Sequence, residues 1–438
     1  MTPPFLFLYN NVRTIRMVLS MQNKKFTVAI IGVGGRGGFA YGTLLNNLPE
    51  KFDIVSLCDI KEDKLAYFSK KFGVSQENLF TDEDNFFKQK RADLLLIATQ
   101  DKDHIRHATK AFNVGYDILL EKPISDNKQE LEHLLALQKK SGCKALVCHV
   151  LRYAPAFMKA AELLDSGAIG RLVSINAIEQ VGYFHQAQAY VRGYWRKKEN
   201  STPMILAKCS HDLDLIQFYA NSSCETLSSI GELTHFKKEE APEGATERCL
   251  NCPHQNTCPY SAKTQYLDNW LKDKTDAYPY NVPCTPPITE EKMRAALETT
   301  LYGKCVYHCD NDVVDHQLTQ MLFKNGVKAN LTMMAFTRHC GRRMEFFGTK
   351  GQITLDEVRD FIRVGVFGEP EYEIKISELT NSTHLHGGGD YGLVETLYDM
   401  MTGSAPEKTA LAHSVESHLM GIAAEESRKA GGKLLSVH

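Results

Sequence analysis

The sequence predicts an α/β protein in which a doubly wound parallel sheet is followed by an α+β domain with a large, mostly antiparallel sheet. Two observations predict this fold. The apolar segment FTVAIIG at residues 26–32 does not alternate, as expected of a parallel strand buried on both faces. After residue 170, segments such as RLVSINAIEQVGYF alternate apolar and polar residues, as antiparallel strands do. With 438 residues, 43% of them hydrophobic, the chain is long enough for two cores.

Composition narrows the classes of partner. The formal net charge is −2 with both signs interspersed, which provides no basic face for nucleic acid. No segment is long and apolar enough to span a membrane, and residues 1–20 do not form a signal peptide, so we treat them as an extension, disordered or upstream of the folded chain. Twelve cysteines, scattered through apolar segments such as SLCDI, predict reduced thiols in a cytoplasmic protein.

The first strand runs into a glycine-rich turn, GVGGRG, that fits G-x-G-x-x-G. Its first glycine permits the tight turn, its second lets a pyrophosphate approach the backbone, and its third lets the following helix pack closely. A second strand, FDIVSLCD, ends at Asp59, about 20 residues further on, where a carboxylate would bind a ribose diol and repel a 2′-phosphate. This order predicts dinucleotide binding rather than a plain turn. Asp59 favours NAD, although Lys61 would tolerate NADP. The predicted contacts in the turn are Gly32, Gly34, Gly35, Arg36 and Gly37.

Two later strands end at the same edge of the predicted sheet. The strand in ADLLLIATQDKDH places Thr99, Gln100 and His104 there, and His104 either neighbours the cofactor or caps a helix at the surface. The strand in YDILLEKPIS ends at Glu121 and Lys122. From position alone, that lysine is either a solvated strand end or an ammonium aimed at cofactor and substrate.

Together these motifs carry a family resemblance. The glycine turn, the strand-end aspartate, AT-x4-H-x3-A at residues 98–108, EKP at 121–123 and RYAPAF at 152–157 resemble the Gfo/Idh/MocA oxidoreductases, from about residue 24 to the C-terminus. The resemblance implies a Rossmann domain over residues 21–150 and a substrate-binding and oligomerisation domain over 151–438, whose sheet covers the nicotinamide. It implies a sugar, cyclitol or related polyol substrate and a homodimer or homotetramer formed through that sheet. It also places Glu121 and Lys122 at the cofactor, Lys122 against the reacting hydroxyl, and Arg152 and Tyr153 on the substrate side.

The segment STPMILAKCSHDLDLIQFYA predicts one helix with Thr202 as N-cap and Pro203 in its first position. At helical spacing Lys208, His211 and either Asp212 or Asp214 share a face. An imidazole here either accepts the proton of an oxidised alcohol or is a buried histidine beside a salt bridge.

The resembled family has D-x-x-x-H-x-x-D on this helix, and its histidine is the usual acid/base. His211 and Asp214 match, whereas Ala207 stands where the first aspartate is expected. This leaves His211 with Lys122, or with Lys208, to handle the proton.

Two further segments are candidates for substrate contacts. AYVRGYWRKK gathers Arg192 and Trp195, which suit either a sugar or a subunit interface. HLHGGGDYGLVETL places His386 and Asp390 around three glycines, which indicates either a ligand-binding loop or a linker followed by an N-cap aspartate.

A cysteine motif lies in an insertion at about residues 240–300. Cys249, Cys252 and Cys258 follow C-x2-C-x5-C spacing, and three of them nearly complete a structural zinc site, although no fourth ligand is evident. Reduced thiols are the main alternative, and a disulfide or a metal cluster are the others.

The leading functional hypothesis is an NAD-dependent oxidoreductase that acts on a CH–OH group of a sugar or polyol. The runner-up is an NAD-dependent glycosidase that oxidises, eliminates and reduces again, which the alanine at position 207 keeps open. A third hypothesis, a non-catalytic NAD-binding regulator, is opposed by the presence of Lys122 and His211.

Overall fold

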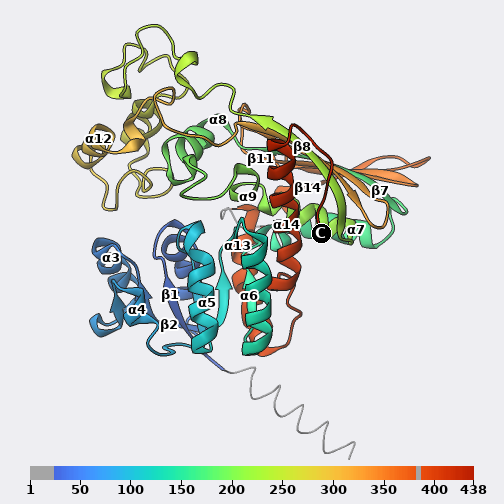
Figure 1. The fold of residues 1–438 in the computed structure, drawn as a ribbon, viewed down its shortest axis with the longest axis horizontal. Helices are drawn as coiled ribbons and strands as arrows, with labels where there is room; N and C mark the ends of the chain where they lie inside the picture. Colours follow the sequence, from blue (N-terminus) through green and yellow to red (C-terminus); the bar gives the residue numbers. More distant parts are fainter. Residues whose placement is uncertain (1–23, 381–385) are drawn as a thin grey trace, which may run out of the picture. The chain divides into compact units, whose positions relative to one another are not determined.

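The computed structural model describes residues 24–380 and 386–438, so the expected extension at residues 1–20 lies outside the described residues (Figure 1). The chain divides into two compact units. The first contains the residues up to Ile124 together with Gln129–Phe157 and Ser382–Ser414, and the second contains Ser125–Lys128, Met158–Asn381 and Val415–His438. In the described part of the chain, no helix is long and apolar enough to cross a membrane.

The described residues of the first unit form a six-stranded sheet in the order β3-β2-β1-β4-β5-β6, and every neighbouring pair is parallel. This confirms the predicted parallel sheet. The strands are β1 (Phe26–Ile31), β2 (Phe52–Cys58), β3 (Leu79–Phe80), β4 (Leu94–Ile97), β5 (Asp117–Leu120) and β6 (Ala145–Val147).

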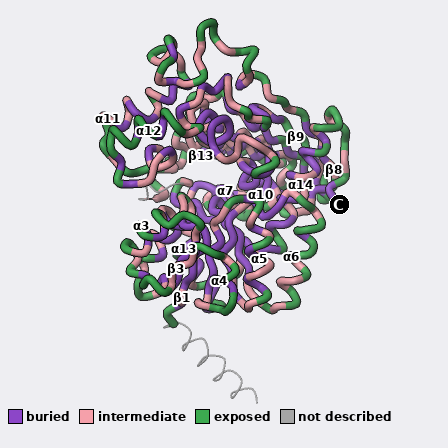
Figure 2. The backbone as a smooth tube through the Cα atoms, turned by 60° about the vertical axis from the view of Figure 1, so that its left-hand side comes forward, coloured by how far each residue is buried: buried purple, intermediate pink, exposed green. Residues whose placement is uncertain are grey.

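Helices follow most strands of this sheet, and α5 and α6 lie side by side in Figure 1. β1 and β4 are buried along nearly their whole length, which explains their unbroken apolar sequences (Figure 2). The helical segments are η1 (Gly35–Gly42), α2 (Thr43–Asn46), α3 (Glu62–Phe72), η2 (Gln76–Asn78), α4 (Glu83–Phe86), η3 (Asp101–Asp103), α5 (His104–Val114), α6 (Lys128–Ser141), η4 (Val150–Tyr153), η12 (His386–Gly388) and α13 (Gly389–Thr402).

The helix α13 belongs to the first unit although it lies near the end of the sequence. Its apolar face, which includes Leu393, Val394 and Leu397, joins the buried cluster that contains Val28 and Ile30 of β1. The two units therefore do not divide at one point near residue 150, because burial of this face returns the segment to the first unit.

The described residues of the second unit contain a nine-stranded sheet in the order β14-β13-β12-β11-β7-β10-β9-β8-β15. Alternating burial along β7 and β9 confirms that one face of this sheet is covered. The strands are β7 (Leu172–Gln180), β8 (Cys224–Glu232), β9 (His316–Phe323), β10 (Lys328–Met334), β11 (Gly341–Gly348), β12 (Gly351–Asp356), β13 (Phe361–Val366), β14 (Tyr372–Lys375) and β15 (Leu435–Ser436).

The predicted hairpin at Asn325 and Gly326 is present. It joins antiparallel β9 and β10, and Gly326 has a positive φ of 87°. One strand pair differs from the expectation of antiparallel pairing, because β10 and β7 run parallel. These two strands are far apart in the sequence, so no tight turn forces them to be antiparallel.

The insertion between β8 and β9 has a small core of its own. Trp270, Met293 and Leu297 are buried in a cluster that also includes Cys249. Its helical segments are η7 (Lys238–Glu240), η8 (Cys249–Asn251), η9 (Lys263–Asp268), α11 (Asn269–Asp273), α12 (Glu290–Thr299) and η10 (Leu301–Gly303). The other helical segments of the second half are α7 (Pro155–Asp165), α8 (Tyr183–His185), η5 (Gln186–Arg192), η6 (Tyr194–Arg196), α9 (Met204–Ala207), α10 (Ser210–Ala220), η11 (Ile376–Glu378) and α14 (Leu411–Lys429).

Candidate functional site

The glycine turn after β1 contains two kinds of glycine. Gly32 has a positive φ of 89°, and a Cβ on Gly37 would lie 2.0 Å from the carbonyl oxygen of Gly32, so both are needed for the turn to close. By contrast, a Cβ on Gly35 would meet nothing within 4 Å, and one on Gly34 would meet only Lys64 Nζ, at 3.6 Å. The backbone at Gly34 and Gly35 is therefore open to a ligand, with an ammonium close by.

Asp59 follows β2 and is tied to this turn. Its Oδ2 accepts a hydrogen bond from the backbone N–H of Val33 at 2.9 Å, and its Oδ1 accepts one from the backbone N–H of Lys61 at 3.0 Å. The next residue, Ile60, is 86% exposed, which is unusual for a large apolar side chain. The strand-end acid is therefore followed directly by an exposed apolar side chain, and the sequence pattern did not single out Ile60.

Arg36 of the turn is engaged by two carboxylates. Its Nε donates to Glu121 Oε1 at 2.7 Å, its Nη2 donates to Asp390 Oδ1 at 2.5 Å, and the same Nη2 donates to the Tyr41 hydroxyl at 2.6 Å. His386 Nδ1 lies 2.9 Å from Asp390 Oδ2. These contacts bring together four predicted site residues, namely Arg36, Glu121, His386 and Asp390. Within this group, Arg36 and His386 both point at Asp390.

The charged groups in this network shift the pKa values of the two buried carboxyl groups. Burial raises the pKa of Asp390, but Arg36 and His386 outweigh it and hold the pKa well below the usual range. Burial likewise opposes ionisation of Glu121, whose pKa is nevertheless lowered by Arg36 and Lys122. Asp390 lies in the first turn of α13 and the N-cap is Gly388, so the expected N-cap aspartate is wrong. The left-handed φ of Gly388, 89°, explains why a glycine takes the cap.

Lys122 follows Glu121, the first residue after β5, and its backbone N–H is hydrogen-bonded. Its N–H donates to Glu121 Oε2 at 2.9 Å, while the other oxygen of that carboxylate binds Arg36. Lys122 is partly exposed, whereas Glu121 is 5% exposed. A partly exposed lysine thus follows a strand end whose backbone is held by a buried carboxylate.

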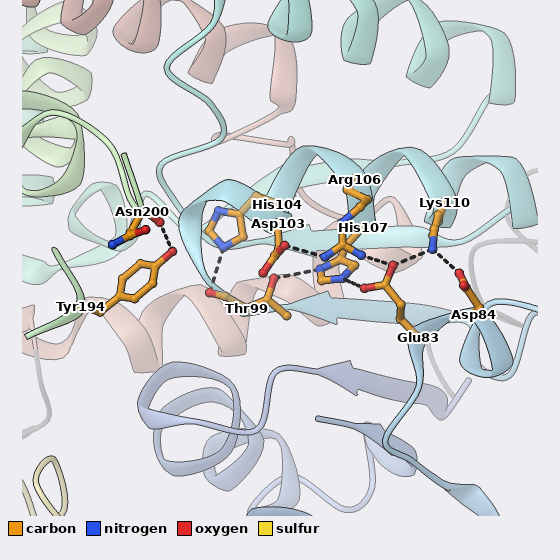
Figure 3. Close-up of polar contacts among 10 residues, drawn as sticks. All are labelled: Glu83, Asp84, Thr99, Asp103, His104, Arg106, His107, Lys110, Tyr194 and Asn200. Carbon is orange, nitrogen blue, oxygen red and sulfur yellow. Dashed lines mark hydrogen bonds and ion pairs between the residues drawn. The ribbon is translucent and has the colours of Figure 1, made fainter. Parts of the chain in front are cut away.

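His104 braces the ends of β4 and β5. It is 1% exposed, and its Nδ1 lies 2.6 Å from the Pro123 carbonyl oxygen. Its Nε2 lies 3.3 Å from the Thr99 carbonyl oxygen (Figure 3). The surface helix cap considered from the sequence is therefore wrong, because the ring fills a buried gap between two strand ends. Gln100 is exposed at the same edge.

A second chain of contacts extends from Thr99 (Figure 3). Its hydroxyl lies 2.9 Å from His107 Nδ1, and His107 Nε2 lies 2.7 Å from Glu83 Oε2. Burial raises the pKa of Glu83, but Lys110, Arg106 and His107 lower it to about 2. The Thr99 side chain is thereby oriented by a charged group on α4.

In the second unit, the predicted single helix is broken. α9 ends at Ala207 and α10 begins at Ser210, and Pro203 rather than Thr202 immediately precedes α9. The chain leaves helical geometry at Cys209, where ψ is 10°. His211 and Asp214 both lie on α10 and are 4% and 1% exposed.

Lys208 joins a buried ionic network. Its Nζ lies 2.9 Å from Glu179 Oε1, and Arg342 bridges Glu179 at 2.8 Å and Asp212 at 2.9 Å. Burial and Glu179 raise the pKa of Asp212, against the opposing effect of Arg342. The sequence pattern did not single out Glu179, although this residue occupies an inward-facing position of β7 in phase with Ile175.

Two predicted substrate residues are turned inward in the first unit. The Tyr153 hydroxyl lies 3.0 Å from Thr409 Oγ1, and Arg152 Nη1 donates to the Lys408 carbonyl oxygen at 3.2 Å. Both side chains are buried, at 3% and 8% exposure. These positions do not favour direct substrate contacts.

The aromatic and basic segment at residues 190–196 separates into two parts. Arg192 is 0% exposed and donates to the carbonyl oxygens of Lys304 and Tyr260, so its position does not favour a sugar contact. Trp195 is partly exposed and packs beside Tyr190 and Tyr194. Of these two predicted substrate residues, only Trp195 remains accessible.

None of the described cysteines forms a disulfide. In the described ranges, no three His, Cys, Asp or Glu side chains lie close enough together to hold one metal ion. The expected zinc ligands Cys249, Cys252 and Cys258 therefore do not form a closed single-ion site as they stand.

A parallel sheet with an open glycine turn and a strand-end aspartate, joined to a large mixed sheet, defines a two-unit NAD-binding oxidoreductase architecture. The model of the NAD-binding Rossmann-fold domain of the Gfo/Idh/MocA oxidoreductase family matches residues 26–149, and that of its C-terminal alpha/beta domain matches residues 161–435. The chain belongs to this family.

Individual known proteins are similar to this chain, two of them in sequence and one in fold. The putative oxidoreductase YteT of Bacillus subtilis is 23% identical over 389 residues, which cover 83% of this chain and 87% of that protein. D-xylose dehydrogenase of Paenarthrobacter nicotinovorans is 28% identical over 201 residues, covering 42% of this chain and 51% of the relative. The structure of levoglucosan dehydrogenase with NADH and levoglucosan has a TM-score of 0.69 at 16% identity and covers 94% of this chain and 100% of its own.

Proposed function

We propose that the protein transfers hydride between a CH–OH group of a sugar, cyclitol or related polyol and NAD. The observation that carries the proposal is the anchoring of Lys122, whose backbone is held by a carboxylate that Arg36 fixes in turn. A positioned ammonium stabilises the alkoxide that develops when an alcohol is oxidised. The names of the xylose and levoglucosan relatives support a sugar-type substrate.

The residues around the glycine turn fit the cofactor. Open backbone at Gly34 and Gly35 suits a pyrophosphate, and Asp59, already held by two N–H groups, retains lone pairs for a ribose diol. When bound, NAD supplies the hydride acceptor. We assign NAD rather than NADP, because the Asp59 carboxylate would repel a 2′-phosphate.

We assign the substrate proton to His211. Imidazole exchanges protons near neutrality, whereas the alternative group, Lys208, is already paired with the buried Glu179 carboxylate. Asp214 follows His211 by one helical turn on α10 and is the candidate to orient its ring.

Kinetics of Lys122→Ala and His211→Ala test these roles. Each variant should lower turnover by roughly a hundredfold or more and leave NAD affinity nearly unchanged. If both residues act on one oxygen, the double variant should lose far less than the product of the two single losses. Lys102→Ala, which removes an exposed lysine after β4, is the matched control and should keep full turnover. Near wild-type turnover of His211→Ala would move the proton acceptor elsewhere.

A panel of polyols and glycosides, beginning with xylose and levoglucosan, identifies the net reaction. Oxidation should form one NADH per substrate consumed. Sugar release without a net change in NADH would instead identify the transient-oxidation glycosidase. If the protein turns over no compound of the panel, the result would favour a non-catalytic NAD-binding protein.

We also propose that the chain forms a homo-oligomer through the sheet of the second unit. Ile230 of β8 and Leu318 of β9 are directly paired, and both are exposed, at 55% and 42%. Such a paired apolar surface favours burial against another subunit. Light scattering coupled to size exclusion should give a dimer or tetramer, and Ile230→Lys should shift it toward monomer.

A further inference from the structure

The insertion between β8 and β9 gathers four cysteines around one small cavity. Its volume is about 20 Å³, and Cys249, Cys252, Cys258 and Cys305 all line it. The first three belong to the C-x2-C-x5-C motif, whereas the fourth comes from a segment about fifty residues later. The tertiary structure thus supplies the fourth thiol that the sequence motif lacks.

Backbone pairing fixes the fourth cysteine beside the motif. An isolated antiparallel bridge joins Arg248 to Lys304, and the backbone N–H of Cys305 donates to the Glu247 carbonyl oxygen at 2.8 Å. These bonds hold the residues before Cys249 and Cys305 in register. The meeting of the four thiols is therefore built into the backbone.

Arg192 provides an independent sign of negative charge at this place. Its fully buried guanidinium donates to two carbonyl oxygens, at 2.7 Å and 2.6 Å, and points Nη2 at Cys249 Sγ, 3.5 Å away. Among the described residues, no carboxylate forms an ion pair with it. A buried charge without a counterion is costly, and neutral thiols provide none. Metal-bound thiolates would provide it.

We propose that Cys249, Cys252, Cys258 and Cys305 bind an iron–sulfur cluster. A single zinc ion at about 2.3 Å from each sulfur would draw the four sulfurs to within about 3.8 Å of one another. In the described chain no three such ligands are close enough to share an ion, and the thiols surround a space instead. A cluster fills such a space, because each thiolate binds its own iron.

The surroundings of the cavity suit this occupant. Val306 and Tyr307 contribute buried apolar walls that limit access of water. His254 also lines the cavity, but its Nε2 lies 2.8 Å from the Glu243 carbonyl oxygen, so Cys305 is the better fourth ligand. The cluster would fasten the two ends of the insertion together. This inference does not depend on the proposed hydride transfer.

Metal analysis of the full-length protein, purified anaerobically without chelator, tests the cluster. We expect about four iron atoms and four acid-labile sulfides per chain, with visible absorption that bleaches on reduction. Cys252→Ser and Cys305→Ser should each lose most of the iron. Cys284→Ser is the matched control, because Cys284 lies in the same insertion but does not line the cavity, and it should keep the full iron content.

The wild-type measurement decides the matter even if a ligand variant does not fold. One zinc per chain without iron would overturn the cluster in favour of a single-ion site. Absence of bound metal after anaerobic reconstitution with ferrous iron and sulfide would overturn the site itself. Full iron content in soluble Cys305→Ser would overturn Cys305 as the fourth ligand.

Discussion

Asp390 is a buried carboxylate that two neighbouring side chains hold in place. It is 2% exposed and binds both Arg36 and His386, so removing its charge leaves the partly buried Arg36 guanidinium with Glu121 as its remaining carboxylate partner. Asp390→Asn should lower the free energy of unfolding by about 2 kcal/mol at pH 7. Chemical denaturation measures the change. Asp310→Asn, which breaks a half-exposed ion pair with Arg196, should cost at most about 0.5 kcal/mol.

The same carboxylate predicts a dependence on pH. The pKa of Asp390 is lowered in the folded protein, so its stabilisation is present above the ordinary aspartate value of about 4 and is lost as the pH falls toward the folded value. Between about pH 5 and 3, wild type should therefore lose more stability than Asp390→Asn. Equal losses in the two proteins would show that Asp390 is not the titrating group.

Asp59 is the residue on which we expect the choice between NAD and NADP to depend. Asp59→Asn keeps an acceptor for the Val33 N–H but removes the charge, so the ratio of NADP to NAD affinity should rise by about tenfold. Calorimetric titration of both cofactors measures the ratio. An unchanged ratio would mean that discrimination comes from elsewhere, with Lys61 and Lys64 as the first residues to test.

Ala207 departs from the family pattern, and the structure shows which carboxylates lie near its neighbour. Lys208 pairs with Glu179 of β7, and Arg342 links that pair to Asp212 of α10. Acidic groups thus gather around the end of α9 from other elements. The alanine removes one carboxylate without leaving Lys208 unpaired.

Two glycines at the start of η1, Gly35 and Gly37, are expected to respond in opposite ways to substitution. A side chain at Gly37 would collide with the Gly32 carbonyl oxygen at 2.0 Å, so Gly37→Ala should strongly destabilise the first unit. At Gly35 a side chain has free space, so Gly35→Ala should melt within a few degrees of wild type yet bind NAD about tenfold more weakly. Unchanged NAD affinity of Gly35→Ala would show that no phosphate approaches this backbone.

Within the first unit, helix α13 packs against η4 through glycines. A Cβ on Gly389 would lie 2.4 Å from the Val150 carbonyl oxygen, and one on Gly392 would lie 2.6 Å from that of Tyr153. The glycine-rich segment, considered from the sequence as a ligand loop or linker, thus permits close packing of α13 on η4. Close packing also brings Asp390 to Arg36.

Helix α13, near the end of the sequence, completes the core of the first unit. Residues 24–157 alone lack the apolar face of α13, which buries part of the first core. We expect that fragment to be poorly soluble and to unfold without cooperativity. The same fragment joined by a flexible linker to residues 386–414 should unfold cooperatively and bind NAD. Equal solubility and NAD binding of both fragments would contradict this interpretation.

Local pattern was enough for much of the fold. The apolar strand and glycines at residues 26–37, the strand end at Lys122 and the hairpin at Asn325 each depend on residues close in sequence, because turn geometry and strand burial are set locally. The alternating segments of the second half likewise predicted strands. Those patterns do not specify which distant strands pair, so the parallel neighbours β7 and β10 were not foreseen.

The sequence by itself determined the parallel sheet, the open glycine turn and the strand-end residues Asp59 and Lys122. Only the tertiary structure decided that Arg36 binds Asp390, 354 residues away, and that Glu179 meets Lys208. It also decided that Cys305 joins the cysteine motif. The physical reason is that buried charges and thiols find partners through the closure of sheets and the packing of helices, which no local spacing encodes.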